Sequence, residues 1–181
     1  MRLDWVPALQ RPDLLAAPVR SALEGMQRAD RADPSRWEVA EIDPSLADTA
    51  ALVEATGLAM ADMANCIVIA GSRAGEERVC AALVLGTTRA DVNRTVRKAL
   101  DVRKCSFMPM DDAVERSGMD YGGITPLGLP EDWPVLVDAR VVERELIVIG
   151  SGLRRSKLRL PGPVAAQLPG ARVVEGLALE V

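Results

Sequence analysis

Histidine is absent from this 181-residue chain, and that absence excludes several kinds of chemistry. Without an imidazole there is no serine–histidine or cysteine–histidine nucleophilic pair and no histidine-bound metal. The three cysteines, Cys66, Cys80 and Cys105, are too few and too scattered to close a zinc site, and their odd number indicates reduced thiols. Any chemistry must therefore rest on carboxylates, amines, guanidinium groups, hydroxyls, amides or the backbone itself.

Aromatic residues are scarce as well, at 3% of the chain, so the core must be built from aliphatic side chains and methionine. No apolar run approaches the roughly 18 residues needed to cross a bilayer. The N-terminus also lacks a basic segment followed by an apolar one, so we expect a cytoplasmic protein with no membrane partner. A net charge of −4 argues against DNA as a partner, and any RNA would have to meet a local basic patch.

The apolar runs at 66–70 and 79–85 predict two buried strands joined as a hairpin. Other strands and helices alternate along the chain, which predicts an α+β single domain with a curved, mixed, barrel-like β-sheet flanked by helices. We expect residues 1–43 to form an N-terminal extension of one helix and one strand, packed on a domain of residues 44–181. Ser45 and Gly57 are the expected caps of a helix ending at Thr56.

The most distinctive segment is Tyr121-Gly-Gly-Ile-Thr-Pro-Leu-Gly-Leu-Pro130, whose adjacent glycines and following proline require a sharp turn. A short strand after it ends on Asp138, and a second apolar strand ends on Gly150-Ser151-Gly152. A bare glycine pair is usually only a structural turn. The three features together favour a built site.

The order of these pieces resembles the YbaK/ProX family, the prolyl-tRNA-synthetase-associated domain that hydrolyses mischarged aminoacyl-tRNA in trans. The likeness runs from about Thr49 to the C-terminus and is most specific in the Gly-Gly-x-x-Pro loop. It implies an aminoacyl-tRNA as substrate, a small amino acid as the group removed, a synthetase as a second partner, and no cofactor. The oligomeric state is not readable from the sequence.

The resemblance also implies roles for individual residues. The amides of Gly122 and Gly123 would hold the ester carbonyl as negative charge develops on it. Asn65 stands where the family usually carries a lysine, so this chain either hydrolyses with altered strength or specificity, or binds aminoacyl-tRNA without turnover. Asp138 would orient the loop, unless it is an ordinary turn residue. The expected pocket walls are Thr125, Pro126, Gly150, Ser151 and Gly152.

Two basic faces could meet RNA, although clusters of this size are common on soluble surfaces. Arg155, Lys157 and Arg159 alternate along a predicted strand and so point to one side. On a predicted helix over 91–100, Arg94, Arg97 and Lys98 lie opposite the apolar face. We expect these residues to contact phosphates and to make binding salt-dependent.

Overall fold

The computed structural model describes residues 1–29 and 36–181. The α-helices are α1 Ala17–Arg28, α2 Thr49–Thr56, α3 Arg97–Ala99, α4 Met110–Ser117 and α5 Ala139–Val142. A π-helical turn, Val92–Val96, leads into α3, and short 3₁₀ turns include η4 Pro44–Leu46, η5 Met60–Asp62 and η7 Gly162–Gln167. The strands are β1 Val6–Pro7, β2 Glu38–Glu41, β3 Ala64–Arg73, β4 Glu76–Leu85, β5 Thr88–Ala90, β6 Lys104–Phe107, β7 Val135–Asp138, β8 Ile147–Gly150, β9 Ser156–Leu160, β10 Ala171–Val174 and β11 Ala178–Glu180.

These strands form two main sheets with a small extra pair. One sheet has the order β10-β7-β4-β3-β6, another β1-β2-β9-β8, and β11 pairs with β5. Within the larger sheet β3 and β4 form the predicted antiparallel hairpin, whereas β7 runs parallel to both β4 and β10. The α+β class and the mixed sheet are therefore confirmed. Closure into a barrel is not confirmed, since β6 and β10 remain open edges within the described residues.

The main core lies between the two sheets. Leu83 and Val137 from the larger sheet pack there with Ile149 and Leu158 from the smaller one, and Val19 of α1 joins the same cluster. Helix α1 thus packs against the main core, while the division of the chain at residue 43 stays a prediction. No helix within the described ranges is long and apolar enough to cross a membrane.

Helix ends near the sheets follow from local sequence, with one correction. Gly57 and Gly118 end α2 and α4 in the left-handed conformation that glycine adopts readily. The predicted N-cap Ser45 is wrong, because Ser45 lies in η4 and helix α2 starts only at Thr49. Asp48 caps α2 instead, with its carboxylate accepting the Ala50 N–H at 3.0 Å. The N-terminus of α2, with Asp48 and Thr49, therefore lies beside the start of β3.

Candidate active site

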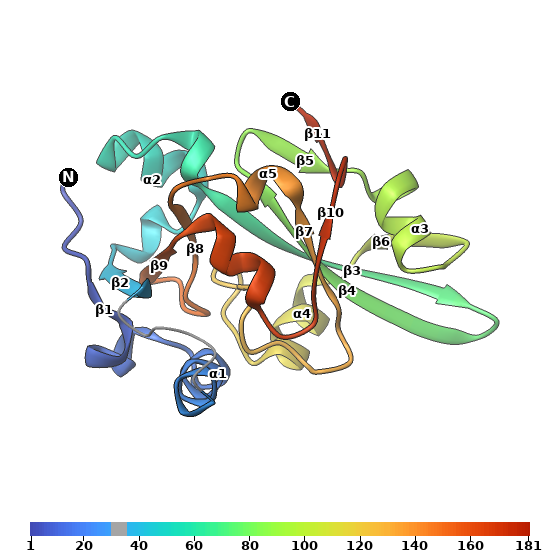
Figure 1. Ribbon diagram of the computed structural model, residues 1–181, viewed down its shortest axis with the longest axis horizontal. Helices are drawn as coiled ribbons and strands as arrows, with labels where there is room; N and C mark the ends of the chain where they lie inside the picture. Colours follow the sequence, from blue (N-terminus) through green and yellow to red (C-terminus); the bar gives the residue numbers. More distant parts are fainter. Residues whose placement is uncertain (30–35) are drawn as a thin grey trace.

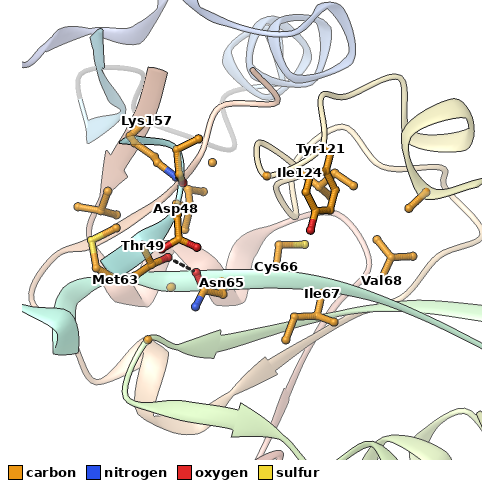
Figure 2. Close-up of a pocket in the computed structure, with 18 of the residues that line it drawn as sticks. Asp48, Thr49, Met63, Asn65, Cys66, Ile67, Val68, Tyr121, Ile124 and Lys157 are labelled. Carbon is orange, nitrogen blue, oxygen red and sulfur yellow. Dashed lines mark hydrogen bonds between the residues drawn. The ribbon is translucent and has the colours of Figure 1, made fainter. Parts of the chain in front are cut away.

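A pocket of about 770 Å³ opens where the two sheets meet. Its walls come from the start of β3, the N-terminus of α2, the loop after α4 and the facing ends of β8 and β9 (Figure 2). The sheets are joined there by a parallel bridge between Met63 and Val148. Four of the seven methionines of the chain line the pocket, which gives it an apolar and adaptable surface; they are Met60, Met63, Met108 and Met110.

The glycine loop forms one wall of this pocket. The Gly123 N–H donates to the Asp120 carbonyl at 2.9 Å, which closes a turn whose third residue is Gly122. Gly122 has a φ of +76°, a value that a type II turn requires there and that favours glycine. Gly122 lines the pocket, and its N–H has no partner among the described residues. The Gly123 amide is occupied by the turn, so the predicted pair of donors is reduced to one.

The loop is held from behind by β8 and by the turn that follows it. A Cβ on Gly150 would lie 2.2 Å from the Gly123 carbonyl oxygen, so only glycine permits this contact. Arg154 donates from Nη1 to the Tyr121 carbonyl at 3.0 Å and from Nη2 to the Pro44 carbonyl at 3.3 Å. Arg154 was not predicted as a site residue, because its role depends on segments over thirty residues away in sequence.

Asn65 lies at the start of β3 and is among the residues that line the pocket. The Thr49 hydroxyl donates to Asn65 Oδ1 at 2.8 Å (Figure 2). This bond occupies the carbonyl side of the amide and leaves the NH₂ group as a donor. The start of α2 therefore orients the one predicted site residue of β3.

Lys157 is a correction to the predicted basic face. Its alternation with Arg159 along β9 is confirmed, but its side chain is only 6% exposed and lines the pocket. Residues 44–49 cover that face, and Lys157 Nζ donates to the Ala47 carbonyl at 2.8 Å. Burial lowers the pKa of Lys157 to about 8, opposed by the carboxylate of Asp48. It cannot act as an exposed phosphate contact.

The other predicted basic residues lie outside the pocket. Arg159 donates to Glu38 Oε2 at 2.6 Å and lies over the Trp5 ring at 4.6 Å, so its charge is already paired. Arg155 is exposed and donates to the Asp13 carbonyl. The helical cluster of Arg94, Arg97 and Lys98 is exposed. The apolar residues of the same segment, Val96 and Leu100, pack with Ile69 on the face of β3 opposite to the pocket residue Val68.

Asp138 does not lie at the loop. It is 1% exposed and caps α5, accepting the Arg140 N–H at 3.0 Å and the Ala178 N–H at 2.9 Å. Burial raises the pKa of Asp138, but hydrogen bonds from Arg140 outweigh it and lower the pKa overall. Its geometry is that of a buried structural cap joining α5 to β11.

Four of the five predicted pocket walls lie behind the pocket. Thr125, Pro126, Ser151 and Gly152 are buried and are not among the described residues that line it, whereas Gly150 is. The Ser151 hydroxyl is bonded to Ser156 Oγ at 2.7 Å, and Gly152 donates from its N–H to the Gly123 carbonyl at 2.9 Å. Ser151 and Gly152 therefore pack behind the loop.

Exposed apolar side chains surround the pocket mouth. Phe107 and Tyr121, the single phenylalanine and single tyrosine of the chain, are 62% and 59% exposed, and Met110 is 50% exposed. All three line the pocket. Their exposure could not be read from the sequence, although their rarity was a signal. Flat exposed rings at a pocket mouth are suited to stacking on a nucleobase.

The pocket offers donors rather than nucleophiles. Cys66 lines it, but burial raises the pKa of its thiol well above the usual range, so the nucleophilic thiolate is disfavoured. Within the described residues, no three His, Cys, Asp or Glu side chains gather closely enough to bind a metal ion. The Gly122 amide, the Asn65 amide and the Lys157 amine can hold a carbonyl oxygen while water attacks its carbon.

Comparisons with known proteins find one matching family and several solved structures of similar fold. The family model of the aminoacyl-tRNA editing domain matches residues 43–167. No curated protein matches. Among solved structures, the hypothetical protein APE2540 is similar at 18% identity and a TM-score of 0.72, over 87% of this chain and 99% of that one. A candidate trans-editing enzyme for prolyl tRNA synthetase is similar at 21% identity and a TM-score of 0.72, over 88% and 94%. A candidate signal transduction protein from Marinobacter aquaeolei is similar at 19% identity and a TM-score of 0.59, over 92% of this chain and 31% of that one.

Proposed function

Because the chain belongs to the aminoacyl-tRNA editing domain family, we propose that it hydrolyses the ester bond of a mischarged aminoacyl-tRNA in trans. The observation that carries the proposal is the convergence of Gly122, Asn65 and Lys157 on one pocket. These residues come from a loop and from strands of both sheets. None of them is a nucleophile at neutral pH, whereas each can donate a hydrogen bond to a substrate oxygen.

In the proposed complex, the aminoacyl group enters the pocket and the terminal adenosine stays at its mouth. The methionine-rich lining would accept a small apolar side chain through dispersion contacts. Phe107 and Tyr121 would stack on the adenine. This arrangement brings the ester to the boundary between the apolar interior and the polar donors.

The reaction we propose adds a water oxygen to the ester carbonyl carbon. The electron pair of the carbonyl moves to its oxygen, which the Gly122 N–H holds as charge develops. Collapse of this intermediate breaks the bond to the ribose oxygen, and a water proton goes to that oxygen as the leaving group. The products are a free amino acid and an uncharged tRNA. Selectivity by hydrolysis is needed because synthetase pockets discriminate only about 1–3 kcal/mol per methylene.

The test is a deacylation assay with a panel of mischarged tRNAs carrying small amino acids, such as alanyl-, cysteinyl- and prolyl-tRNA. Free amino acid should appear at a rate above that of the uncatalysed ester. Ala50 is exposed and lines the pocket, so Ala50→Trp should fill the pocket and abolish release. Glu54→Trp, on the exposed side of α2 outside the pocket lining, is the matched control and should remain active. Absence of release from every tRNA would overturn the proposed hydrolysis.

A second function is favoured by the uncharged Asn65 at the start of β3. With an amide there, the domain could hold aminoacyl-tRNA without turnover, alone or beside the synthetase that made it. The likeness to a candidate trans-editing enzyme for prolyl tRNA synthetase motivates that partner. Tight binding of charged tRNA with no release of amino acid would support this function against the first.

A further inference from the structure

The pocket contains an isolated buried cation. Among the described residues that line it, Asp48 and Lys157 carry the only charges. Asp48 is exposed, and one of its carboxylate oxygens caps α2 by accepting the Ala50 N–H. Lys157 is 6% exposed and forms no ion pair within 4.0 Å in the described part of the chain. Its recorded hydrogen bond goes to a neutral carbonyl, so two of its three N–H donors remain for a ligand.

Lys157 is coupled to Asn65 through one short segment. Lys157 Nζ donates a hydrogen bond to the Ala47 carbonyl. Asn65 accepts a hydrogen bond from the hydroxyl of Thr49, two residues after Ala47 in the chain. Figure 2 shows these side chains at the same end of the pocket, with Tyr121 and Ile124 at the other. Residues 47–49 therefore bond to both the Lys157 amine of β9 and the Asn65 amide of β3, and hold the two groups at one end of the pocket.

The position is costly for stability, which argues against a purely structural role. A buried ammonium group without a close carboxylate loses hydration that a carbonyl replaces only in part. A methionine of the same length would fill the space at lower cost. Groups held in such unfavourable environments, inside a pocket, are concentrated at functional sites.

Resting on the proposed hydrolysis, we propose that Lys157 is a catalytic residue whose ammonium group binds the ester carbonyl oxygen and stabilises its negative charge in the transition state. Asn65, which lies at the same end of the pocket, would hold the adjacent substrate oxygen. Lys157 is joined to the loop wall by its cross-strand partner Gly150, which contacts the Gly123 carbonyl. Lys157 thus supplies from β9 the positive charge that Asn65 cannot supply from β3.

This role sets a pH dependence. The charged groups that face Lys157 are Asp48, which favours the ammonium form, and Arg154, which disfavours it. Because burial lowers the pKa of Lys157 to about 8, the active ammonium form disappears as the pH rises through that value. Hydrolysis, corrected for the uncatalysed reaction, should fall over the same range.

The kinetic experiment compares Lys157→Met, Lys157→Arg and the wild type from pH 6 to pH 9.5 on one mischarged tRNA. Lys157→Met should lower kcat by about 10²-fold or more, as removal of one oxyanion donor does, with a smaller change in KM. Lys157→Arg should recover part of kcat and lose the fall near pH 8, because guanidinium stays charged. Arg172→Met removes an exposed cation of β10 and should match the wild type. Full activity of a folded Lys157→Met protein would overturn the proposal.

A binding experiment separates this inference from the proposed hydrolysis. The probe is the adenosine 3′-ester of 1-aminoethylphosphonate, an anionic mimic of the intermediate formed from alanyl-adenosine and water. The wild type should bind it more tightly at pH 7 than at pH 9.5, and Lys157→Met should lose that difference. If the wild type hydrolyses no tRNA yet shows this dependence, the hydrolase fails while Lys157 stands as the anion-binding group. Equal affinity of wild type and Lys157→Met would refute the role of Lys157 in either case.

Discussion

At the scale of single residues, the side-chain bond from Thr49 to Asn65 is the most direct test of the β3 end of the site. Thr49→Val keeps the branched shape but removes the donor, which frees the Asn65 amide to rotate. We expect a fall in deacylation of about 5- to 20-fold, in line with the ~1 kcal/mol of a hydrogen bond or somewhat more. Thr49→Ser retains the hydroxyl and should keep most of the rate. Equal rates for Val and Ser would show that Asn65 does not need this orientation.

Asn65 itself gives the complementary test. In this pocket Lys157 already provides an ammonium group, so Asn65→Lys places a second cation near the first and raises their mutual repulsion. We therefore expect Asn65→Lys alone to change turnover little, and to restore turnover most clearly in the Lys157→Met background. Folding of each variant is checked by circular dichroism. Failure of the double variant to exceed Lys157→Met would show that the two positions do not serve the same charge.

Lys157 also predicts how stability varies with pH. Its pKa is about 8 in the folded protein and 10.5 ordinarily, so between these values the unfolded chain binds more protons. Stability of the wild type should rise with pH across that range, by about 3 kcal/mol from this group. Lys157→Met lacks this contribution and should be the more stable protein at pH 7, with the advantage shrinking by pH 10.5. Urea denaturation of both proteins at pH 7 and pH 10.5 measures this difference in the free energy of unfolding. The same change with pH in both proteins would contradict the prediction.

At the scale of elements, the glycine loop and the end of β8 form one packed unit. A Cβ on Gly123 would lie 2.8 Å from backbone atoms of Leu153, and one on Gly150 would lie 2.2 Å from the Gly123 carbonyl. A Cβ on Gly122 would instead meet the mobile end of Arg154 at 2.8 Å. Gly123→Ala and Gly150→Ala should therefore destabilise by about 1–3 kcal/mol or more, and Gly122→Ala by about 1 kcal/mol. Thermal unfolding measures the relative stability of the three variants. Because Gly122→Ala should be the least destabilised, it is the variant in which an effect on hydrolysis can be separated from an effect on folding.

The elements that the sequence predicted are those with several turns or a long apolar run. β3 and β4 are confirmed because the apolar runs at 66–70 and 79–85 are typical of buried strands. β1 and β5, of two and three residues, carry no such pattern and depend on partners distant in the chain. The site shows the same limit. Alternation correctly placed Lys157 and Arg159 on one face, but only the fold shows that residues 44–49 and Trp5 cover it.

At the scale of the whole molecule, we expect the exposed rings at the pocket mouth, here called the rim, to bind the terminal adenosine while the pocket binds the aminoacyl group. Phe107 comes from β6 and Tyr121 from the loop after α4, and both are more than half exposed. Their replacement by alanine should therefore leave stability nearly unchanged while weakening binding of the tRNA end by about 1–3 kcal/mol for each stacked base. Tyr121→Phe keeps the ring and is the matched control. Unaltered affinity of a Phe107→Ala/Tyr121→Ala protein for aminoacyl-adenosine would remove the rim from the binding site.

Exposed basic residues lie around β6, the strand at one edge of the larger sheet. Phe107 ends β6, the edge strand, whose neighbouring residues Arg103 and Lys104 are exposed, and β6 lies beside α3 (Figure 1). Along the chain, Arg103 and Lys104 stand between Phe107 at the pocket mouth and the helical cluster of Arg94, Arg97 and Lys98, and so mark one path for the tRNA. If the tRNA follows this path, reversal of the three cluster charges to glutamate should weaken binding and reduce the slope of log affinity against log salt by up to about 2–3. The glutamine triple should give an intermediate slope, and Arg172→Glu on the opposite sheet edge should change neither quantity. An unchanged slope in the glutamate triple would mean that phosphates contact the protein only at the pocket mouth.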